Sequence, residues 1–370
     1  MLIKYNEKLS YRVITDINDL KKFIESNSVN LSDFDTSSVF LSEEFIMAWV
    51  EHYKTYIHDL AFIIYNKDNT VIGISPLYIK KSGHLELRFL CTGENEEDEI
   101  SSEYLDFIIN EEHKDDILLM FVDYLIRNSN KWKNLVVNSY TPHSFINKNL
   151  IPYLEKNKYS IFTENIGSRY YLDLPDSNED FYKSKKGSFY NGLKRKHRKL
   201  LKSEDIKYEI ISDSTHLDKY FNALKDLHNQ RWKRSNVRGV FESDVFFNFH
   251  KSISHKLLTK NYLFLFIMSD NEDVISILYG YIFKNVLHFY QSGYTTPKYQ
   301  NLSIGAVSHI MAIEYAISKN LSTYDFMLGS SDSYKNQYKC RKENIYQSEI
   351  YKPGIYGKLK LLIRKIHDPG

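Results

Sequence analysis

The chain has 370 residues, more than a single hydrophobic core usually holds, so two domains are the default expectation. Apolar residues make up 42% and charged residues 26% of the chain, which is typical of a folded globular protein with an ordinary soluble surface. The formal net charge is only +2, so no whole-molecule field attracts a polyanion. A nucleic-acid partner would therefore have to bind a local patch.

The cysteines and the apolar segments exclude further classes of protein. Cys91 and Cys340 are the only cysteines, and they lack the spacing of zinc ligands or of a disulfide framework. Residues 1–14 lack the basic and apolar regions of a signal peptide, and no window approaches the roughly 18 consecutive apolar residues of a membrane-spanning helix. We therefore expect a cytoplasmic protein that holds no metal.

The first half of the chain predicts an amphipathic helix followed by a hairpin. Ser42 can cap a helix over residues 43–53, which has two glutamates in its first turn and apolar residues at helical spacing. The β-branched and aromatic runs 60–66 and 71–81 are separated by the turn-like Lys-Asp-Asn-Thr, so they predict a hairpin. The acidic segment 94–99 then predicts a solvated loop.

Two pairs of segments resemble each other in the same order along the chain. Residues 71–81 read VIGISPLYIKK and residues 274–284 read VISILYGYIFK, with Val, Ile, Ile, Tyr, Ile and Lys shared at the same offsets. Residues 101–109 and 321–328 each place a Tyr shortly before Asp-Phe in an apolar run. These two echoes favour a duplicated domain.

The second half alternates helices and strands. A predicted strand over residues 168–177 makes a natural start for it, so the predicted domains are residues 1–165 and 166–370. After further helices come three strands, a helix and a last strand. This order predicts a mixed α/β sheet with a crossover helix and not a Rossmann repeat.

One junction in the second half has the pattern of a phosphate-binding site. The segment YQNLSIGAVSH at 299–309 passes from a polar loop into a helix with small residues at its N-terminus. Unpaired backbone N–H groups there carry partial positive charge and can hold a pyrophosphate. An ordinary serine-capped helix is the alternative. The predicted phosphate-binding residues are Gln300, Ser303, Ile304, Gly305 and Ala306.

A set of short motifs in a fixed order carries a family resemblance. The motifs NQRW at 229–232, FYQSGY at 289–294, YQNLSIG at 299–305 and YDFMLGSSDSYKNQY at 324–338 resemble those of GNAT-superfamily acyltransferases. More closely, they resemble the tandem-domain branch called CelD/BcsL-like or FemAB-like, of exopolysaccharide and cell-envelope biosynthesis. FLSEEFIMAWVEHY, GISPLY and SEYLDF extend the resemblance into the first half.

This resemblance implies an α/β (α+β) fold of two GNAT-like domains, each a mixed, mostly antiparallel sheet flanked by helices. It also implies acetyl-CoA or another acyl-CoA as co-substrate, bound by the C-terminal domain. The N-terminal domain is expected to be degenerate, because the acidic segment 94–99 stands where phosphate-binding amides would be needed. One departure is Ser303, which occupies the place of the first glycine in the phosphate loop of simple GNAT enzymes.

Three side chains are candidates for the catalytic groups that acyl transfer needs. Transfer from a thioester to an amine needs an unprotonated amine, donors for the oxyanion and a proton source for the thiolate. His288 and Asp325 are predicted to lie on neighbouring strands and are the candidates for the base, with a buried structural role as the alternative for each. The resemblance implies that Tyr334 protonates the thiolate, and side-chain packing is its alternative role.

Two cations are predicted to bind anionic groups of the substrates. Arg231 and Lys335 are these candidates, and a solvated surface position is the alternative for Lys335. Trp232, next to Arg231, is expected in the core.

The favoured function is N-acyl transfer from acyl-CoA to an amino group of a sugar or of another cell-envelope or polysaccharide precursor. Fem-like transfer of an aminoacyl group from tRNA to a peptidoglycan precursor is one alternative. A non-catalytic binding protein on a degenerate GNAT fold is the other.

Two basic segments bear on the partners. Residues 194–199 are all basic, but six consecutive positions point all round a helix, so a solvated face is predicted. Contact with tRNA, with anionic lipid or with an anionic glycan-carrier substrate is the alternative. Residues 356–368 mix leucine and isoleucine with lysine and arginine, which indicates peripheral contact with the inner face of the membrane.

Overall fold

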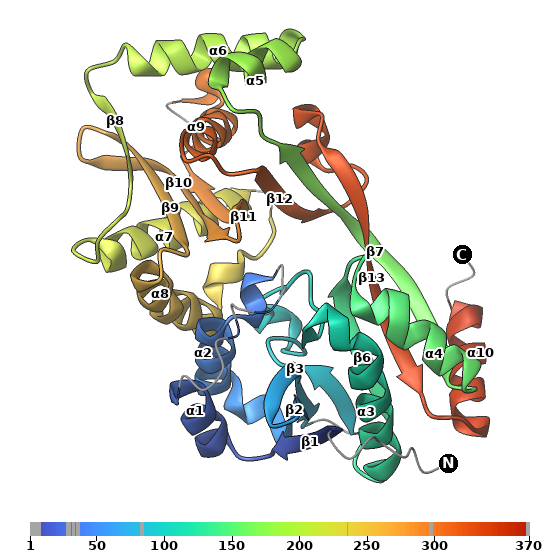
Figure 1. The fold of residues 1–370 in the computed structure, drawn as a ribbon. Coiled ribbons are helices and arrows are strands. Elements are labelled where there is room, and N and C mark those ends of the chain that lie inside the picture. Colours follow the sequence, from blue (N-terminus) through green and yellow to red (C-terminus); the bar gives the residue numbers. More distant parts are fainter. Residues whose placement is uncertain are drawn as a thin grey trace. The chain divides into compact units, whose positions relative to one another are not determined.

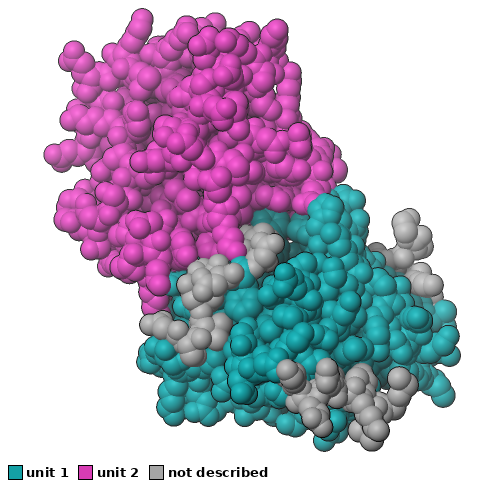
Figure 2. Space-filling view, viewed as in Figure 1, with its two compact units in different colours: residues 1–167, 344–370 teal, residues 168–343 magenta. Residues whose placement is uncertain are grey.

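The chain forms two compact units, which Figure 2 shows in different colours. Unit 1 comprises residues 1–167 and 344–370, and unit 2 comprises residues 168–343. The computed structural model (Figure 1) describes residues 9–26, 31, 34, 38–81, 85–234, 236–295 and 299–367.

The last segment of the chain differs from the predicted domain division. Residues 344–370 were assigned to the second domain, whereas the structure groups them with unit 1. The physical reason is main-chain pairing, because β13 (Arg341–Tyr351) pairs antiparallel with β6 (Asn134–Tyr140). The first break, between residues 167 and 168, lies close to the predicted boundary.

Unit 2 is an α/β unit with a six-stranded order of β7-β12-β11-β10-β9-β8. Neighbouring strands pair antiparallel except β11 and β12, which are parallel and are joined by the crossover helix α9. Helices α7 and α8 lie on one side of these strands, and α9 lies on the other side with α5 and α6 (Figure 1). The helices are α5 (Asn178–Ser184), α6 (Ser188–Leu201), α7 (Leu217–Arg234), α8 (Asp244–Thr259) and α9 (Ile304–Ser318). The strands are β7 (Ser160–Asp173), β8 (Ile206–Ile210), β9 (Leu263–Asp270), β10 (Asp273–Phe283), β11 (Val286–Tyr294) and β12 (Thr323–Gly329).

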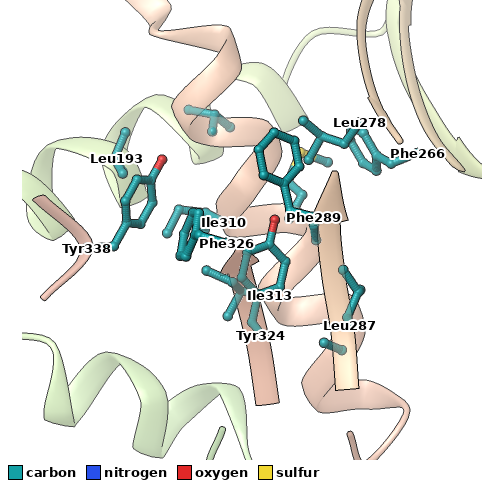
Figure 3. Close-up of a cluster of buried hydrophobic side chains, with 14 of the residues drawn as sticks. Leu193, Phe266, Leu278, Leu287, Phe289, Ile310, Ile313, Tyr324, Phe326 and Tyr338 are labelled. Carbon is teal, nitrogen blue, oxygen red and sulfur yellow. The ribbon is translucent and has the colours of Figure 1, made fainter. Parts of the chain in front are cut away.

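The core of unit 2 lies between α9 and the sheet (Figure 3). Leu287 and Phe289 of β11, and Tyr324 and Phe326 of β12, pack in one cluster with α9 residues such as Ile313. Because side chains alternate along a strand, the residues between them point to the opposite face of the sheet. Two of the predicted catalytic residues are such intervening residues.

Unit 1 repeats this arrangement. Its strands are ordered β1-β2-β3-β4-β6-β13, with β4 and β6 parallel and joined across α3, as β11 and β12 are across α9. The same succession of elements in both units supports the predicted duplication. The other helices are α1 (Ile17–Glu25), α2 (Glu43–Tyr53), α3 (Lys114–Arg127), α4 (Ile151–Lys156) and α10 (Ile355–His367). The other strands are β1 (Leu9–Ile14), β2 (Ile57–Lys67), β3 (Thr70–Lys80), β4 (Glu86–Phe89) and β5 (Ile108–Ile109).

Two local predictions in unit 1 are confirmed. The Ser42 hydroxyl accepts a hydrogen bond from the Phe45 amide at the start of α2. Strands β2 and β3 form the predicted hairpin, and its turn places Asp68 and Asn69 in the left-handed region with φ of 48° and 66°. The first pair of similar segments falls on the equivalent strands β3 and β10.

The second pair of similar segments is a coincidence. Residues 321–328 fall largely on β12, whereas residues 101–109 lie between β4 and α3, and the strand equivalent to β12 is β6. Asp106 also has a different task from Asp325, because it accepts hydrogen bonds from the Phe145 amide, at 2.7 Å, and from the next amide. Asp106 is thus a partly buried cap for the helical turns that begin at residue 146, and desolvation raises its pKa to about 7.

Candidate active site of unit 2

The parallel strands of unit 2 part at one end. Strands β11 and β12 pair at three positions, residues 286–288 with residues 323–325. Among the described residues, β11 runs on to Tyr294 and β12 to Gly329 without further pairing between them. A register shift against β10 leaves Tyr290 as a bulge in β11. Parting strand ends beside a bulge are typical of a binding or catalytic site.

The N-terminus of α9 follows this end of β11 in the chain. Ser303 precedes the helix in the left-handed region, with φ and ψ of 50°, and its side chain makes no capping bond to the helix that the structure describes. The first amides of α9, at residues 304–306, therefore present the partial positive charge of a helix N-terminus. The Lys196 ammonium of α6 donates to the Ser303 hydroxyl at 2.7 Å and adds a full positive charge. The side chain of Gln300 lies outside the described residues.

Tyr334 is partly exposed, and its hydroxyl lies near His309. Its surface is 43% exposed, while its oxygen lies 3.5 Å from His309 Nε2. On the other side of the imidazole, His309 Nδ1 lies 2.7 Å from the hydroxyl of the fully buried Tyr324. Burial raises the pKa of Tyr334 although Arg231 opposes the shift, so the hydroxyl is protonated at neutral pH.

His309 is a neutral imidazole at neutral pH. Burial, with the charges of Lys335 and Arg231, lowers its pKa to about 3. A neutral ring has one donor and one acceptor nitrogen, so it can donate to Tyr334 while accepting from Tyr324. In that tautomer the Tyr334 proton is available to a third group.

Arg231 lies at the end of α7, close to the same aromatic side chains. Its guanidinium is 4.7 Å from the ring centre of Tyr294 and 5.4 Å from that of Trp232. Both Arg231 and Trp232 are half-buried, so the prediction of Trp232 as a core residue is wrong. A half-buried guanidinium stacked on Tyr294 can hold an anionic group of a substrate.

Asp325 and His288 do meet, as their positions on β12 and β11 predicted. Asp325 Oδ2 lies 2.8 Å from Arg169 Nε of β7 and 3.3 Å from His288 Nδ1, and Oδ1 accepts the Met327 amide at 2.8 Å. Asp325 is fully buried and His288 is 3% exposed. Burial alone would raise the pKa of Asp325, but Arg169, His288 and the amide together lower it. A buried, ion-paired carboxylate with a lowered pKa is a poor base, so this geometry favours the structural alternative for Asp325.

Lys335, predicted as an anion ligand, lies against the main chain of β12. Its ammonium is buried and donates to the carbonyl oxygens of Met327, at 3.2 Å, and of Leu328. These two carbonyls belong to the end of β12, where Leu328 still pairs with Arg169 of β7 after a register shift. Lys335 therefore contacts the main chain of β12, and its role as an anion ligand stays a prediction.

The basic segment of α6 is organised differently from the prediction. Lys196 and His197 point toward α9, where His197 Nδ1 lies 3.6 Å from Glu314. The other basic residues of α6 that line the groove lie on one side of the helix. They are neighbours or are three or four residues apart, and such positions lie close together on a helix surface. The residues that line this open groove, of about 590 Å³, are Asn191, Lys194, Arg195, Arg198, Lys199 and Lys202.

Sequence reasoning missed several residues of the site. Arg169 is far from Asp325 in the chain, and nothing in its local sequence signals the pairing. His309 lies in the second turn of α9, and no local motif distinguishes it from the other residues of that helix. His228 is also buried beside the site, with Nδ1 2.9 Å from the Ser292 carbonyl, and burial lowers its pKa to about 4.

Two further features are absent from the described residues. No cluster of His, Cys, Asp or Glu there could hold a metal ion. No described helix is both long enough and apolar enough to cross a membrane.

Unit 2 has a mixed sheet whose parallel pair is joined by a crossover helix with an open N-terminus. Residues 187–339 match the acetyltransferase (GNAT) domain family. This match lies within unit 2 and covers less than half of the chain. No curated protein sequence matches the chain.

Solved structures show the same fold over both units. FemX is 12% identical, with a TM-score of 0.58 over 92% of this chain and 96% of that one. A conserved protein of unknown function from Bacteroides thetaiotaomicron is 10% identical, with a TM-score of 0.55 over 92% and 100%. L-PGS from Bacillus licheniformis is 12% identical, with a TM-score of 0.52 over 94% and 96%. The chain thus has a tandem GNAT fold of the Fem-like type.

Proposed function

We propose that unit 2 transfers an acyl group from acyl-CoA to an amino group of a sugar or of another cell-envelope or polysaccharide precursor. The observation that supports this most is the match of residues 187–339 to the acetyltransferase domain family. The open N-terminus of α9, with Lys196 beside it, suits the pyrophosphate of the donor. Acyl-CoA is the donor that this domain family uses in general.

Unit 1 offers a poorer place for the same donor. Its helix α3 occupies the position equivalent to α9, but its first turn carries Asp115 and Asp116, and Glu111 and Glu112 precede it. Acidic side chains at a helix N-terminus occupy and neutralise the charge that a phosphate would need. This difference supports a donor site in unit 2 and a degenerate unit 1.

The proposed reaction proceeds by attack of the neutral amine nitrogen on the thioester carbonyl carbon. The ammonium proton leaves to solvent, and the C–N bond then forms. The nitrogen of the tetrahedral intermediate releases a second proton to solvent, and the C–S bond breaks as the intermediate collapses. The leaving thiolate takes the proton of Tyr334, whose oxygen then accepts from His309 Nε2–H until solvent returns a proton to it. Arg231 would hold an anionic group of the donor or acceptor near Tyr294.

Calorimetric titration with acetyl-CoA tests the donor. We expect saturable binding at one site of the whole chain, followed by release of the CoA thiol when amino sugars are added. No heat and no thermal shift at millimolar acetyl-CoA would contradict the proposal.

Gly305 offers a test of where the donor binds. A Cβ atom at Gly305 would lie 2.7 Å from the Tyr294 ring, so both Gly305→Glu and Gly305→Gln push on the same side chain. Only the glutamate adds negative charge beside the pyrophosphate, where repulsion at an effective dielectric constant of about 20 exceeds 1.4 kcal/mol. We expect Gly305→Glu to bind acetyl-CoA at least ~10-fold more weakly than Gly305→Gln, measured by calorimetry. Equal affinities in two folded variants would place the donor elsewhere.

A second candidate function is transfer of an aminoacyl group from tRNA. The basic face of α6 favours it, since this face suits a phosphate backbone. Fluorescence anisotropy with labelled tRNA distinguishes the two functions. Binding that Arg195→Glu weakens, together with no binding of acetyl-CoA, would favour tRNA as the donor.

A further inference from the structure

Helix α10 turns apolar side chains away from its own unit. Five large apolar residues of this helix are between 43% and 86% exposed: Ile355, Tyr356, Leu359, Leu362 and Ile363. Positions i, i+4, i+7 and i+8 among them fall on one side of a helix and form a continuous stripe. The other large apolar side chains of the described chain that are at least 43% exposed lie on separate elements and form no such stripe: Ile126, Leu201, Tyr208, Val237 and Tyr334.

The opposite side of α10 is the one that packs on unit 1. A Cβ atom at Gly357 would lie 3.0 Å from Ser160 and from Tyr351, so the helix contacts β7 and β13 at close range there. Arg364 forms an ion pair with Glu349 of β13 from this side. The exposed stripe therefore does not serve to hold α10 on its own unit.

Two lysines flank the stripe. Lys358 and Lys360 lie on its two sides, and neither forms an ion pair with any residue in the described part of the chain. Their ammonium groups can stay in water while their stems extend along an apolar surface. Protein interfaces are depleted in lysine at their cores, whereas lysines beside an apolar helix face are characteristic of helices that lie on anionic lipid.

We propose that α10 lies in the interface of an anionic lipid bilayer, with Leu359 and Leu362 in the acyl boundary and Lys358 and Lys360 at the phosphate groups. The helix (Figure 1) would hold the protein on the membrane surface without crossing it. This proposal does not depend on which donor unit 2 uses, because α10 belongs to unit 1.

Co-sedimentation of the full chain with lipid vesicles tests this proposal. We expect binding to vesicles of equimolar phosphatidylglycerol and phosphatidylcholine, and at least ~10-fold weaker binding to phosphatidylcholine alone. Leu362→Glu should lower the bound fraction at least ~10-fold, since it places a charge in the acyl boundary. The double variant Lys358→Glu, Lys360→Glu should lower it by a similar factor, at about 1 kcal/mol for each lysine lost.

The matched control is Ile126→Glu, which changes an aliphatic side chain that is 44% exposed on α3 of the same unit. It should bind vesicles as the wild type does. The proposal is overturned if Leu362→Glu binds like the control, or if neutral and anionic vesicles bind equally. It is also overturned if vesicles do not bind and Leu362→Glu dissociates a dimer in sedimentation velocity, because the stripe would then join two copies of the chain.

Discussion

Replacing Asp325 by asparagine is expected to lower the free energy of unfolding by about 3 kcal/mol. The carboxylate is fully buried, and Arg169 and His288 both contact its Oδ2 atom. Removing one partner of a buried ion pair leaves the other charge uncompensated, which costs about 3–5 kcal/mol. The lower end applies because Arg169 also lies 3.7 Å from Glu343. Denaturant unfolding of the variant and the wild type measures the difference.

The matched control is Asp332→Asn, which removes an exposed carboxylate a few residues along the chain. It should change the free energy of unfolding by less than about 0.5 kcal/mol, as surface substitutions usually do. If Asp325→Asn were as mild as this control, the ion pair would contribute nothing to stability. If it were mild and also abolished acyl transfer, the predicted catalytic role of Asp325 would regain support.

The same ion pair makes stability depend on pH. The pKa of folded Asp325 is lowered, so its contribution is fully present above the ordinary aspartate pKa of about 3.9 and is lost as pH falls through the folded value. The stability difference between wild type and Asp325→Asn should therefore be constant near neutral pH and shrink below about pH 4. Unfolding curves over this pH range measure it.

Replacing Tyr334 by phenylalanine is expected to reduce kcat by about 100-fold while the KM for acetyl-CoA changes little. General acid catalysis contributes roughly 10²–10⁴-fold, and the lost hydroxyl is the one that His309 contacts. The ring is retained, so contacts with His309 and Tyr338 remain. Thiol release from acetyl-CoA with an amino sugar as acceptor measures both constants.

Tyr208→Phe is the matched control for this prediction, since Tyr208 is 55% exposed on β8 at the far end of the strand order from β12. It should leave kcat unchanged. A normal kcat in the Tyr334→Phe variant would contradict the role as proton donor and would favour side-chain packing as the role of Tyr334. A raised KM at unchanged kcat would instead indicate that the hydroxyl binds the donor without transferring a proton.

Local patterns predicted much of the fold. Three features depend only on residues that are close together in the sequence, so the sequence predicts them directly. They are the cap at Ser42, the hairpin of β2 and β3, and the crossover helix before β12. The similarity of β3 to β10 also predicted the duplication that the strand orders support. The similarity of residues 101–109 to residues 321–328 did not reflect equivalent elements, because Tyr-Leu-Asp-Phe and Tyr-Asp-Phe are too short to distinguish a helix-capping loop from a strand.

The site was predicted less well, because its electrostatics depend on residues distant in sequence. A lysine is usually exposed, so a surface position was the alternative for Lys335. Its ammonium is instead buried against main-chain carbonyls of β12. The basic residues of α6 were expected to point all round, yet most share one face while Lys196 turns to Ser303. Neither fact follows from spacing alone, since each requires knowing what packs against the helix or strand.

The sequence by itself determined the kind of fold, the order of its elements and the position of the loop-to-helix junction before α9, because these follow from periodicity, capping and short motifs. Only the tertiary structure decided what Asp325 and Tyr334 can do. A carboxylate can be a base or an ion-pair partner, and the contact with Arg169 on β7 favours the ion-pair role for Asp325. A tyrosine can pack or donate, and the neutral His309 beneath Tyr334 gives its hydroxyl the geometry of a proton donor.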